Sequence, residues 1–375
     1  MKPVYPAHPP PLARCRHRDA PRESAPDTPP ETMTGPAPVT AAARADAYAA
    51  SLRLSVAPMM DWTDVHCRQF HRLLAPGARL YTEMVHANAV IHGDRSRLLA
   101  STPEQAPVAL QLGGCEPVLL AQAARIAADH GFDEVNLNCG CPSDRVQAGR
   151  FGACLMREPA VVADCVAAMV AASDVPVTVK CRLGVDEDDD YEVFAAFVDG
   201  AVAAGASMIV VHARNAWLQG LSPKENRDIP PLRYDWGYRL KRERPALPVV
   251  LNGGIATQAA ALAHLDHVDG VMLGRAAYHD PYVLHGVDAA LSGTALRSRA
   301  ELLRALRPYV EMRLSQGVAL KHIVRHVLGL FHGQPGGRLF RQVLSEGAHR
   351  PGAGWSLVER ALAATEGVMG DRNAA

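Results

Sequence analysis

A thiol and a carboxamide stand together at the end of one short apolar run. Residues 134–138 (Glu-Val-Asn-Leu-Asn) are bounded by turn residues and predict a buried strand, and Cys141 follows on the corner Cys139-Gly140-Cys141-Pro142. Gly140 tolerates backbone angles closed to other residues, and Pro142 fixes the chain immediately after the thiol. Cys141 is therefore a candidate reactive group, although a buried cysteine acting as a small apolar side chain gives the same local pattern.

Polar and glycine residues also end the other apolar runs of the chain. Taken singly, each has an ordinary structural explanation, because a glycine pair can be a tight turn and a lysine a solvated strand end. One motif in isolation is weak evidence, but agreement among eight strand ends favours a functional rim. The other ends are Pro58-Met59-Met60, Glu83-Met84, Gln111, Lys180, His212-Ala213-Arg214, Asn252-Gly253-Gly254 and Gly274-Arg275.

The elements that carry these ends alternate between short apolar runs and Ala-rich stretches of helical periodicity. This alternation predicts a parallel (β/α)8 TIM barrel, in which chemistry sits at the carboxyl ends of the strands. The dinucleotide motif G-x-G-x-x-G and the phosphate loop G-x-x-x-x-G-K-[ST] are absent, which disfavours an open sheet. The predicted strands are 54–60, 80–83, 108–112, 134–138, 177–180, 208–212, 249–252 and 270–274, and the clearest predicted helices are 117–130, 160–172, 191–204 and 257–264.

The rim of this barrel has the residue types of a flavin site. Residues 252–254 and 274–275 offer backbone N–H groups, a helix start and a guanidinium, the usual phosphate grip of this fold. Lys180 and Gln111 reach the mouth, where an ammonium could stabilise negative charge on the pyrimidine side of a reduced flavin. Small or unbranched residues at 57–59 let a flat ring lie against the backbone. The set predicts an FMN site with the thiol of Cys141 facing its reactive edge.

Composition places the chain among ordinary globular proteins. Its 375 residues are 48% hydrophobic and carry no net charge, so no global positive charge points to nucleic acid. Eight cysteines lie scattered, without a C-x-x-C pair or zinc-type spacing, which indicates reduced thiols in a cytoplasmic protein. The acidic run 186–190 precedes a predicted helix, where it favours the positive end of the helix dipole rather than a metal. We expect no metal, no membrane span and a monomer.

The first part of the chain differs from the rest. Residues 1–45 hold 11 of the 28 prolines and show no apolar periodicity, which predicts a disordered extension without the apolar core of a signal peptide. Met33 is an alternative start. The expected organisation is a disordered extension over 1–50, a catalytic barrel over 51–293 and a small helical domain over 294–370.

The helical domain carries a local positive charge. Helical periodicity covers 300–314, 318–331, 338–345 and 357–365, separated by Gly and Pro breaks. Between positions 297 and 350 there are ten Lys or Arg residues against three Glu. A cationic helical module beside a flavin barrel suits a phosphate backbone, although a solvated basic face explains each arginine singly. Aromatic residues make up only 5% of the chain, so shape and backbone contacts are the expected mode of recognition.

From about residue 54 to 363 the sequence resembles the tRNA-dihydrouridine synthases, most closely the DusA subfamily. The resemblance rests on the motifs APMMDWT (57–63), TEMV (82–85), QLGG (111–114), NLNCGCPSDRV (136–146), FGACLM (151–156) and GLSPKENR (220–227). It implies that Cys141 is the proton donor. It also implies FMN contacts at Pro58, Met59, Met60, Gln111, Lys180, His212, Asn252, Gly253, Gly254, Gly274 and Arg275, and tRNA contacts at Asn138, Lys224, Arg227, Arg338 and Arg341. The proline-rich extension and Cys139 depart from the family pattern.

The family's reaction agrees with the residues of the rim. NADPH, or NADH as the alternative, reduces the flavin, the flavin passes a hydride to C6 of a uracil, and a protein acid protonates C5. A free thiol with a pKa of about 8.5 is mostly protonated at neutral pH and can donate. A uridine in folded tRNA must leave its stack to reach a barrel mouth. The subfamily resemblance implies positions 20 and 20a of the D-loop.

Two other functions compete with this interpretation. A flavin enzyme acting on free pyrimidines, similar to dihydroorotate dehydrogenase, uses the same hydride and proton positions but needs no basic helical domain. A tRNA-binding or chaperone protein that has lost catalysis needs neither Cys141 nor Lys180. A yellow protein absorbing near about 450 nm would separate an enzyme from a binding protein.

Overall fold

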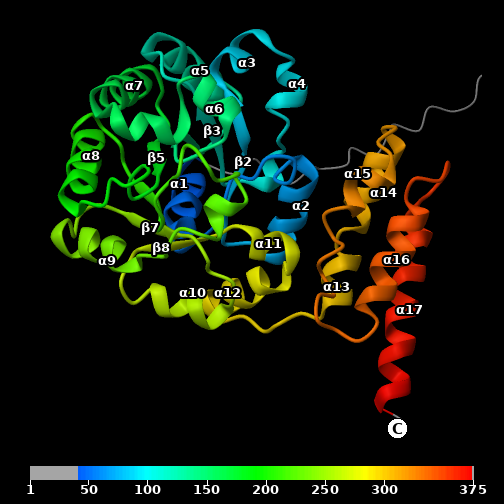
Figure 1. Cartoon of the computed structure of the whole chain (residues 1–375). Helices are drawn as coiled ribbons and strands as arrows, with labels where there is room; N and C mark the ends of the chain where they lie inside the picture. The colour runs from blue at the N-terminus through cyan, green and yellow to red at the C-terminus, as the bar shows by residue number, and fades with distance from the viewer. Residues whose placement is uncertain (1–40, 374–375) are drawn as a thin grey trace, which may run out of the picture. The chain divides into compact units, whose positions relative to one another are not determined.

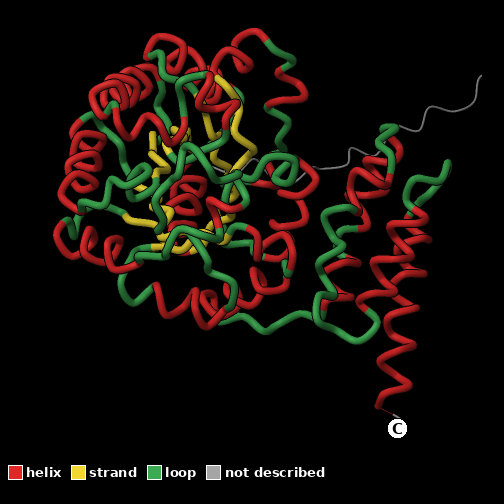
Figure 2. The backbone as a smooth tube through the Cα atoms, in the orientation of Figure 1, coloured by secondary structure: helices red, strands yellow, loops and turns green. Residues whose placement is uncertain are grey.

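The computed structural model describes residues 41–373, and its centre is a closed barrel of eight parallel strands in sequence order. Figure 1 shows the strands enclosed by helices, and Figure 2 shows the same strands in yellow inside a red helical layer. The predicted barrel is confirmed, with strand ends shifted by a few residues. The strands are β1 Leu54–Val56, β2 Arg79–His86, β3 Val108–Gly113, β4 Glu134–Cys139, β5 Val177–Cys181, β6 Ile209–His212, β7 Val249–Asn252 and β8 Gly270–Leu273.

Helices and short 3-10 turns connect successive strands on the outside of the barrel. The predicted helices after β3, β4, β5 and β7 are all present, and α5 packs closely against α7. The connecting elements are α2 Val65–Leu74, α3 Ala87–His92, α4 Arg95–Leu98, η2 Pro103–Gln105, α5 Pro117–Asp129, α6 Asp144–Ala148, η3 Gly152–Arg157, α7 Pro159–Ala172, α8 Tyr191–Ala203, η4 Glu225–Arg227, α9 Tyr234–Glu243, α10 Gln258–His264, α11 Arg275–His279 and α12 Tyr282–Ser292.

Strand alternation sorts the side chains into two layers. Leu110, Val135 and Leu137 point outward into the large core between strands and helices, whereas Ala109 and Val210 belong to a small apolar cluster inside the barrel. Because successive strand residues face opposite sides of a sheet, the residues between the outward ones point inward. Gln111, Asn138, Lys180, His212 and Asn252 all follow this inward alternation toward the carboxyl end of their strands.

The helix α1, Ala41–Ala50, is a correction to the sequence analysis, which assigned disorder up to residue 50. Arg44 donates to Asp133 Oδ1 at 2.7 Å and to the carbonyl oxygen of Gly131 at 2.8 Å, and Tyr48 donates to Glu134 at 2.9 Å. These partners precede or begin β4, so α1 lies at the amino-terminal end of the barrel. The alanine content that resembled a loose tail has high helix propensity, and two polar side chains anchor it. Residues 1–40, where the rest of that prediction falls, lie outside the described residues.

In the described part of the chain, five helices follow α12, where the sequence analysis expected four, because the expected helix 300–314 is divided into two. They are α13 Arg299–Arg304, α14 Arg307–Ser315, α15 Leu320–Val324, α16 Gly337–Gly347 and α17 Trp355–Asn373. The short 3-10 turn η1, Ser51–Arg53, directly precedes β1. Ser298 and Glu301 form a capping box that starts α13, and α16 packs along α17. The boundary of a separate domain at residue 294 stays a prediction. None of the helices within residues 41–373 combines the length and apolarity needed to cross a bilayer.

Candidate active site

The corner after β4 presents one of its two cysteines to the barrel mouth. Cys139 is fully buried in the outer core, and this burial raises the pKa of its thiol well above the ordinary value. Cys141 is half-buried, with its Sγ 3.5 Å from Ser143 Oγ. The Oδ1 atom of Asn138 accepts hydrogen bonds from the backbone N–H groups of Gly140 at 3.1 Å and Cys141 at 3.0 Å. The inert, buried environment that the sequence analysis considered for Cys141 is thus that of Cys139.

Residues 151–153 stabilise this corner through the backbone of Cys141. Ala153 donates its backbone N–H to the carbonyl oxygen of Cys141 at 2.9 Å. Gly152 has a φ of +80°, and a Cβ there would lie 2.5 Å from the same carbonyl oxygen. Only glycine fits this close approach.

Gln111 and Asn138, predicted as a cofactor and a tRNA contact, touch each other. Asn138 Nδ2 donates to Gln111 Oε1 at 2.8 Å, and Gln111 Nε2 donates to Asn136 Oδ1 at 2.8 Å. Gln111 is 1% exposed and Asn138 7%, so their carboxamides are fixed by protein rather than by solvent. Asn136 did not stand out in the sequence, although the alternation of β4 places it on the inner face.

Lys180, His212 and Asn252 form the next part of the inner face. Lys180 Nζ donates to Asn252 Oδ1 at 3.1 Å, and Asn252 Nδ2 donates to the carbonyl oxygen of Met272 at 2.7 Å. Burial, together with the charge of Arg182, lowers the pKa of Lys180 to about 8. Burial and the nearby cations hold the pKa of His212 well below its ordinary value, so its imidazole is neutral.

The glycines at 253 and 254 form an open turn beside these groups. Their φ values are +112° and +67°, and a Cβ on Gly253 would lie 2.7 Å from His212 Cδ2. Tyr234 donates its hydroxyl to the carbonyl oxygen of Gly253 at 2.8 Å, which leaves the turn supported from outside. A cradle without side chains, next to Gly274 at the start of α11, fits a phosphate ester.

Arg275, the predicted phosphate guanidinium, already has a partner. Its Nη2 lies 2.6 Å from Asp228 Oδ1, its Nη1 lies 3.2 Å from Oδ2, and it also donates to the carbonyl oxygen of Arg227. The charge of Arg275 holds the pKa of the Asp228 carboxyl below its usual range. A phosphate at this position must share Arg275 with Asp228 or displace it.

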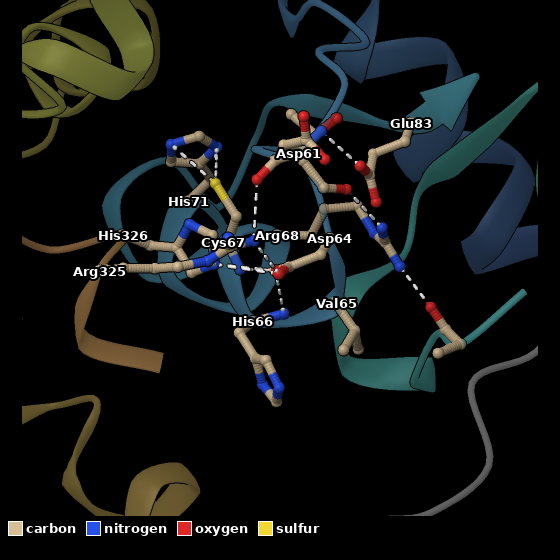
Figure 3. Close-up of polar contacts among 12 residues, drawn as sticks. Asp61, Asp64, Val65, His66, Cys67, Arg68, His71, Glu83, Arg325 and His326 are labelled. Atoms are coloured by element: carbon tan, nitrogen blue, oxygen red, sulfur yellow. Dashed lines mark hydrogen bonds and ion pairs between the residues drawn. The ribbon is translucent and has the colours of Figure 1, made fainter. Parts of the chain in front are cut away.

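The loop after β1 is tied at both ends, as Figure 3 shows. Asp61 has a φ of +63° and donates its backbone N–H to Glu83 Oε1 at 2.6 Å. Arg325 donates to the carbonyl oxygen of Asp61 and to Asp64 Oδ2, both at 2.8 Å, and His326 lies 3.0 Å from Asp64 Oδ1. The helical segment therefore contacts the loop that carries three predicted flavin residues. Of these, Pro58 and Met59 are half-buried and Met60 is 56% exposed.

Asp64 holds that connection together. It caps α2 by accepting from the backbone N–H groups of His66 and Cys67, each at 2.9 Å. Burial alone would raise the pKa of the Asp64 carboxyl, but His326, the N–H of Cys67 and Arg325 hold it well below its usual range. A charged Asp64 at neutral pH thus joins α2 to residues 325–326.

Two side chains that the sequence analysis missed, one buried and one half-buried, connect the thiol corner to the loop after β6. Arg182 donates to the carbonyl oxygens of Gly140 at 3.0 Å and Asn226 at 2.8 Å. Gln147 Nε2 donates to the carbonyl oxygens of Pro142 and Leu218, each at 2.7 Å. Arg182 follows Lys180 by two residues, so the same inward alternation could have identified it. Nothing in the local pattern marks Gln147.

The loop after β6 carries Lys224 and Arg227, two of the predicted tRNA contacts. Both side chains are exposed, while Asn226 between them is fully buried. Asn226 Oδ1 accepts from the backbone N–H of Trp217, and Asn226 Nδ2 donates to the carbonyl oxygen of Trp217. Asp186 also supports this loop by accepting from the N–H of Leu218 at 2.7 Å. The loop is therefore rigid where its basic residues project.

The acidic run 186–190 has two structural roles. Asp190 caps α8 by accepting from the N–H of Glu192, which confirms the predicted helix start. Asp186 and Asp188 pair with Arg157, and Asp189 pairs with Arg233. Within the described part of the chain, no group of His, Cys, Asp and Glu is arranged to hold a metal ion.

The remaining predicted tRNA contacts lie on α16. The side chains of Arg338 and Arg341 are both exposed, and neither forms a hydrogen bond or ion pair with another described residue. By contrast, Arg304 pairs with Glu359 and Glu366, and Arg307 pairs with Glu311. The two α16 arginines thus differ from Arg304 and Arg307 in having no acidic partner among residues 41–373.

Comparisons with known proteins identify the family. The dihydrouridine synthase (Dus) family model matches residues 55–366. A tRNA-dihydrouridine(20/20a) synthase of Xanthomonas campestris is 77% identical over 85% of this chain and 96% of its own length. Namesakes from Xylella fastidiosa and Vibrio cholerae are 73% and 54% identical, each over 84% of this chain and over 95% and 96% of their own lengths. A solved 2-naphthoyl-CoA reductase complex is 12% identical over 64% of this chain and 50% of its own, with a TM-score of 0.46, too distant to bear on function. The chain belongs to the dihydrouridine synthase family.

Proposed function

We propose that this chain is an FMN-dependent enzyme that reduces uridine to 5,6-dihydrouridine at positions 20 and 20a of the tRNA D-loop. The family match and the names of the relatives support the reaction and the positions. The observation that carries the mechanism is the half-buried thiol of Cys141, held at the barrel mouth by Asn138 beside an inner face of Gln111 and Lys180.

The inner face fits a flavin mononucleotide. The side-chain-free turn at 253–254, Gly274 and Arg275 would hold its phosphate, and Gln111, Lys180, His212 and Asn252 would line its ring, with Pro58, Met59 and Met60 from the loop after β1. When bound and reduced by NADPH or NADH, FMN supplies the hydride for C6 of the uracil. The ammonium of Lys180 balances negative charge at the ring.

The chain's own residues supply the proton and place the base. Cys141 donates its proton to C5 of the uracil. Arg182 donates to the carbonyl oxygen of Gly140 at 3.0 Å, so it places a cation beside the corner that donation leaves negatively charged. Asn138 keeps one N–H of its carboxamide for the uracil, because its other groups bond Gln111 and the thiol corner. The uridine is extruded from its stack to reach this site.

Exposed basic residues outside the mouth would hold the rest of the tRNA. Lys224 and Arg227 project from the rigid loop after β6, and Arg338 and Arg341 project from α16. These unpaired cations suit the phosphate backbone. Seven free cysteines among the described residues support a reducing compartment, and we propose that the enzyme acts as a monomer in the cytoplasm.

One experiment tests the reaction and its competitors. The purified protein is incubated with NADPH and tRNA from a strain that lacks dihydrouridine, and the product is mapped by mass spectrometry. The expected result is a yellow protein absorbing near about 450 nm and dihydrouridine at positions 20 and 20a. Reduction of free uracil or orotate but not of tRNA would favour a free-pyrimidine enzyme. A colourless protein that binds tRNA without changing it would favour a binding protein.

A further inference from the structure

A continuous chain of hydrogen bonds runs through the barrel interior from Glu134, the first residue of β4, to the corner that carries Cys141. Every side chain in it is at most 7% exposed. Its links are Thr178 Oγ1 to Glu134 Oε1 at 2.5 Å, Asn136 Nδ2 to Thr178 Oγ1 at 2.8 Å, Gln111 Nε2 to Asn136 Oδ1 at 2.8 Å, Asn138 Nδ2 to Gln111 Oε1 at 2.8 Å, and the backbone N–H of Cys141 to Asn138 Oδ1 at 3.0 Å.

All the donors in this chain point toward Glu134, and the two ends fix that direction. A carboxylate can only accept hydrogen bonds, and the backbone N–H groups of Gly140 and Cys141 can only donate them. Reversing any carboxamide between these ends would place oxygen against oxygen and N–H against N–H. In a buried site such unsatisfied groups cost about 1–3 kcal/mol each, so one orientation is strongly favoured.

Glu134 is itself held as a hydrogen-bond acceptor at the base of the barrel. Its Oε2 accepts from Arg79 at 2.8 Å and from Tyr48 at 2.9 Å, and its Oε1 accepts from Tyr81 at 2.7 Å in addition to Thr178. Burial and the Glu134 charge raise the pKa of both tyrosines well above the ordinary value, so both remain protonated donors. Four donors therefore fix the carboxylate in one position.

We propose that Glu134 is a positioning residue for uridine reduction. Acting through Thr178, Asn136 and Gln111, it fixes the carboxamide of Asn138 and thereby the corner that holds the thiol of Cys141. The proposal rests on the function proposed above, since it concerns the placement of the proton donor. It also assigns a role to the base of the barrel, at the opposite end of β4 from the corner that carries the chemistry.

Thr178 is the best position at which to interrupt the chain of hydrogen bonds. Glu134→Gln would leave the buried Arg79 without its carboxylate, which costs about 3–5 kcal/mol and endangers the fold. Thr178→Val keeps the side-chain shape and the Arg79 ion pair but disconnects Glu134 from the amides. Thr178→Ser restores the hydroxyl. Ser55→Ala is the matched control, because Ser55 is 3% exposed on β1 and its hydroxyl bonds only the carbonyl oxygen of Val271.

Two measurements follow. In single turnovers of pre-reduced enzyme, Thr178→Val should slow dihydrouridine formation about tenfold or more, because small misplacements of reacting groups are costly, while the Kd for tRNA stays unchanged. Thr178→Ser should recover most of the rate, and Ser55→Ala should keep it. Hydrogen exchange at the backbone N–H groups of Gly140 and Cys141 should speed up in Thr178→Val alone.

The outcomes separate this proposal from the proposed function. A Thr178→Val rate within about twofold of wild type, failure of serine to rescue, or an equal loss in Ser55→Ala would overturn the positioning role. Unchanged exchange at 140–141 in Thr178→Val would do the same without any reference to activity. If the wild-type protein makes no dihydrouridine, the proposed function fails, and the exchange measurement still reports whether the chain holds the corner.

Discussion

Cys139 and Cys141 stand two residues apart and differ in what surrounds them. Cys139 points into the outer core with no exposure, whereas Cys141 faces the mouth beside Ser143. We expect Cys141→Ala to keep its flavin and its reduction by NADPH but to lose dihydrouridine formation by about 100-fold or more, since general acid catalysis contributes on that order. Stopped-flow reduction with product analysis measures both steps.

Cys139→Ala is the control for that prediction. It removes a buried sulfur without touching the chemistry, so it should lower stability by about 1 kcal/mol and leave the product yield intact. A near-normal yield of dihydrouridine from Cys141→Ala would contradict the assignment of Cys141 as the proton donor.

Lys180 makes the reaction depend on pH. Burial lowers its pKa from 10.5 to about 8, and the protonated form has the charge that we propose balances the reduced flavin. The rate of flavin reduction should therefore be highest at neutral pH and fall as the pH rises through about 8 and the ammonium loses its proton. Lys180→Met should be slow throughout and should lack this alkaline fall. A wild-type rate that stays flat through this range would contradict the role of Lys180.

The same shift makes the burial of Lys180 a pH-dependent cost to folding. Between pH 8 and 10.5 the unfolded chain binds the Lys180 proton more tightly than the folded chain does. Stability therefore rises with pH through that window, and the cost of burying the charged lysine is fully present below it. A bound flavin anion would reduce this cost.

At the scale of elements, the strands were the most predictable part of the protein. Period-two alternation with apolar outward residues places Gln111, Lys180 and Asn252 on the inner face from the sequence alone. The residues that hold them in place were not predictable, because their roles depend on contacts across the barrel. Thr178 looks like an ordinary strand residue, and Glu134 looks like a strand start until Arg79 and Tyr48 are seen beside it.

Helix α1 shows the limit of composition as evidence. An Ala-rich stretch after a Pro-rich one was grouped with the disordered extension, but Arg44 and Tyr48 bind it to the barrel base. The distinction lies in two side chains whose partners are more than 80 residues away in sequence. Local composition carries no information about such partners.

Truncation tests the role of α1. Removing residues 1–40 should leave flavin content and melting temperature unchanged, as we predict for the extension. Removing residues 1–50 also removes Tyr48 from Glu134, and should lower stability by about 2–4 kcal/mol and the melting temperature by about 5 °C or more. Tyr48→Phe keeps the helix and should show about a quarter to a half of that loss. Equal melting temperatures for the two truncations would mean that α1 adds nothing to the barrel.

At the scale of the whole molecule, charge is neutral in sum and uneven in distribution. Some arginines of the helical segment are neutralised locally, as Arg304 and Arg307 are by glutamates. Arg325 is committed to Asp64 and to the backbone of the loop after β1. The cations left for a phosphate backbone are therefore fewer than the sequence count suggested. Arg338 and Arg341 on α16 are two that have no ion-pair partner among the described residues.

These two arginines stand three residues apart on one exposed helix face and so can contact neighbouring phosphates. We expect Arg338→Ala/Arg341→Ala to raise the Kd for tRNA and to reduce the slope of log affinity against log salt by about one to two units, since each lost phosphate contact removes slightly less than one released counterion. Flavin reduction by NADPH should not change. Binding is measured by titration with tRNA over a range of salt concentrations.

Arg304→Ala/Arg307→Ala provides the matched control for this prediction. It removes the same charge from the same segment at the same spacing, but its arginines already have glutamate partners. If only the general positive charge of the segment matters, both double variants should weaken binding alike. If Arg338 and Arg341 grip phosphates directly, the control should keep nearly the wild-type slope, because paired arginines release few counterions on binding. A wild-type slope in the Arg338/Arg341 variant would instead leave Lys224 and Arg227, on the rigid loop after β6, as the principal phosphate contacts.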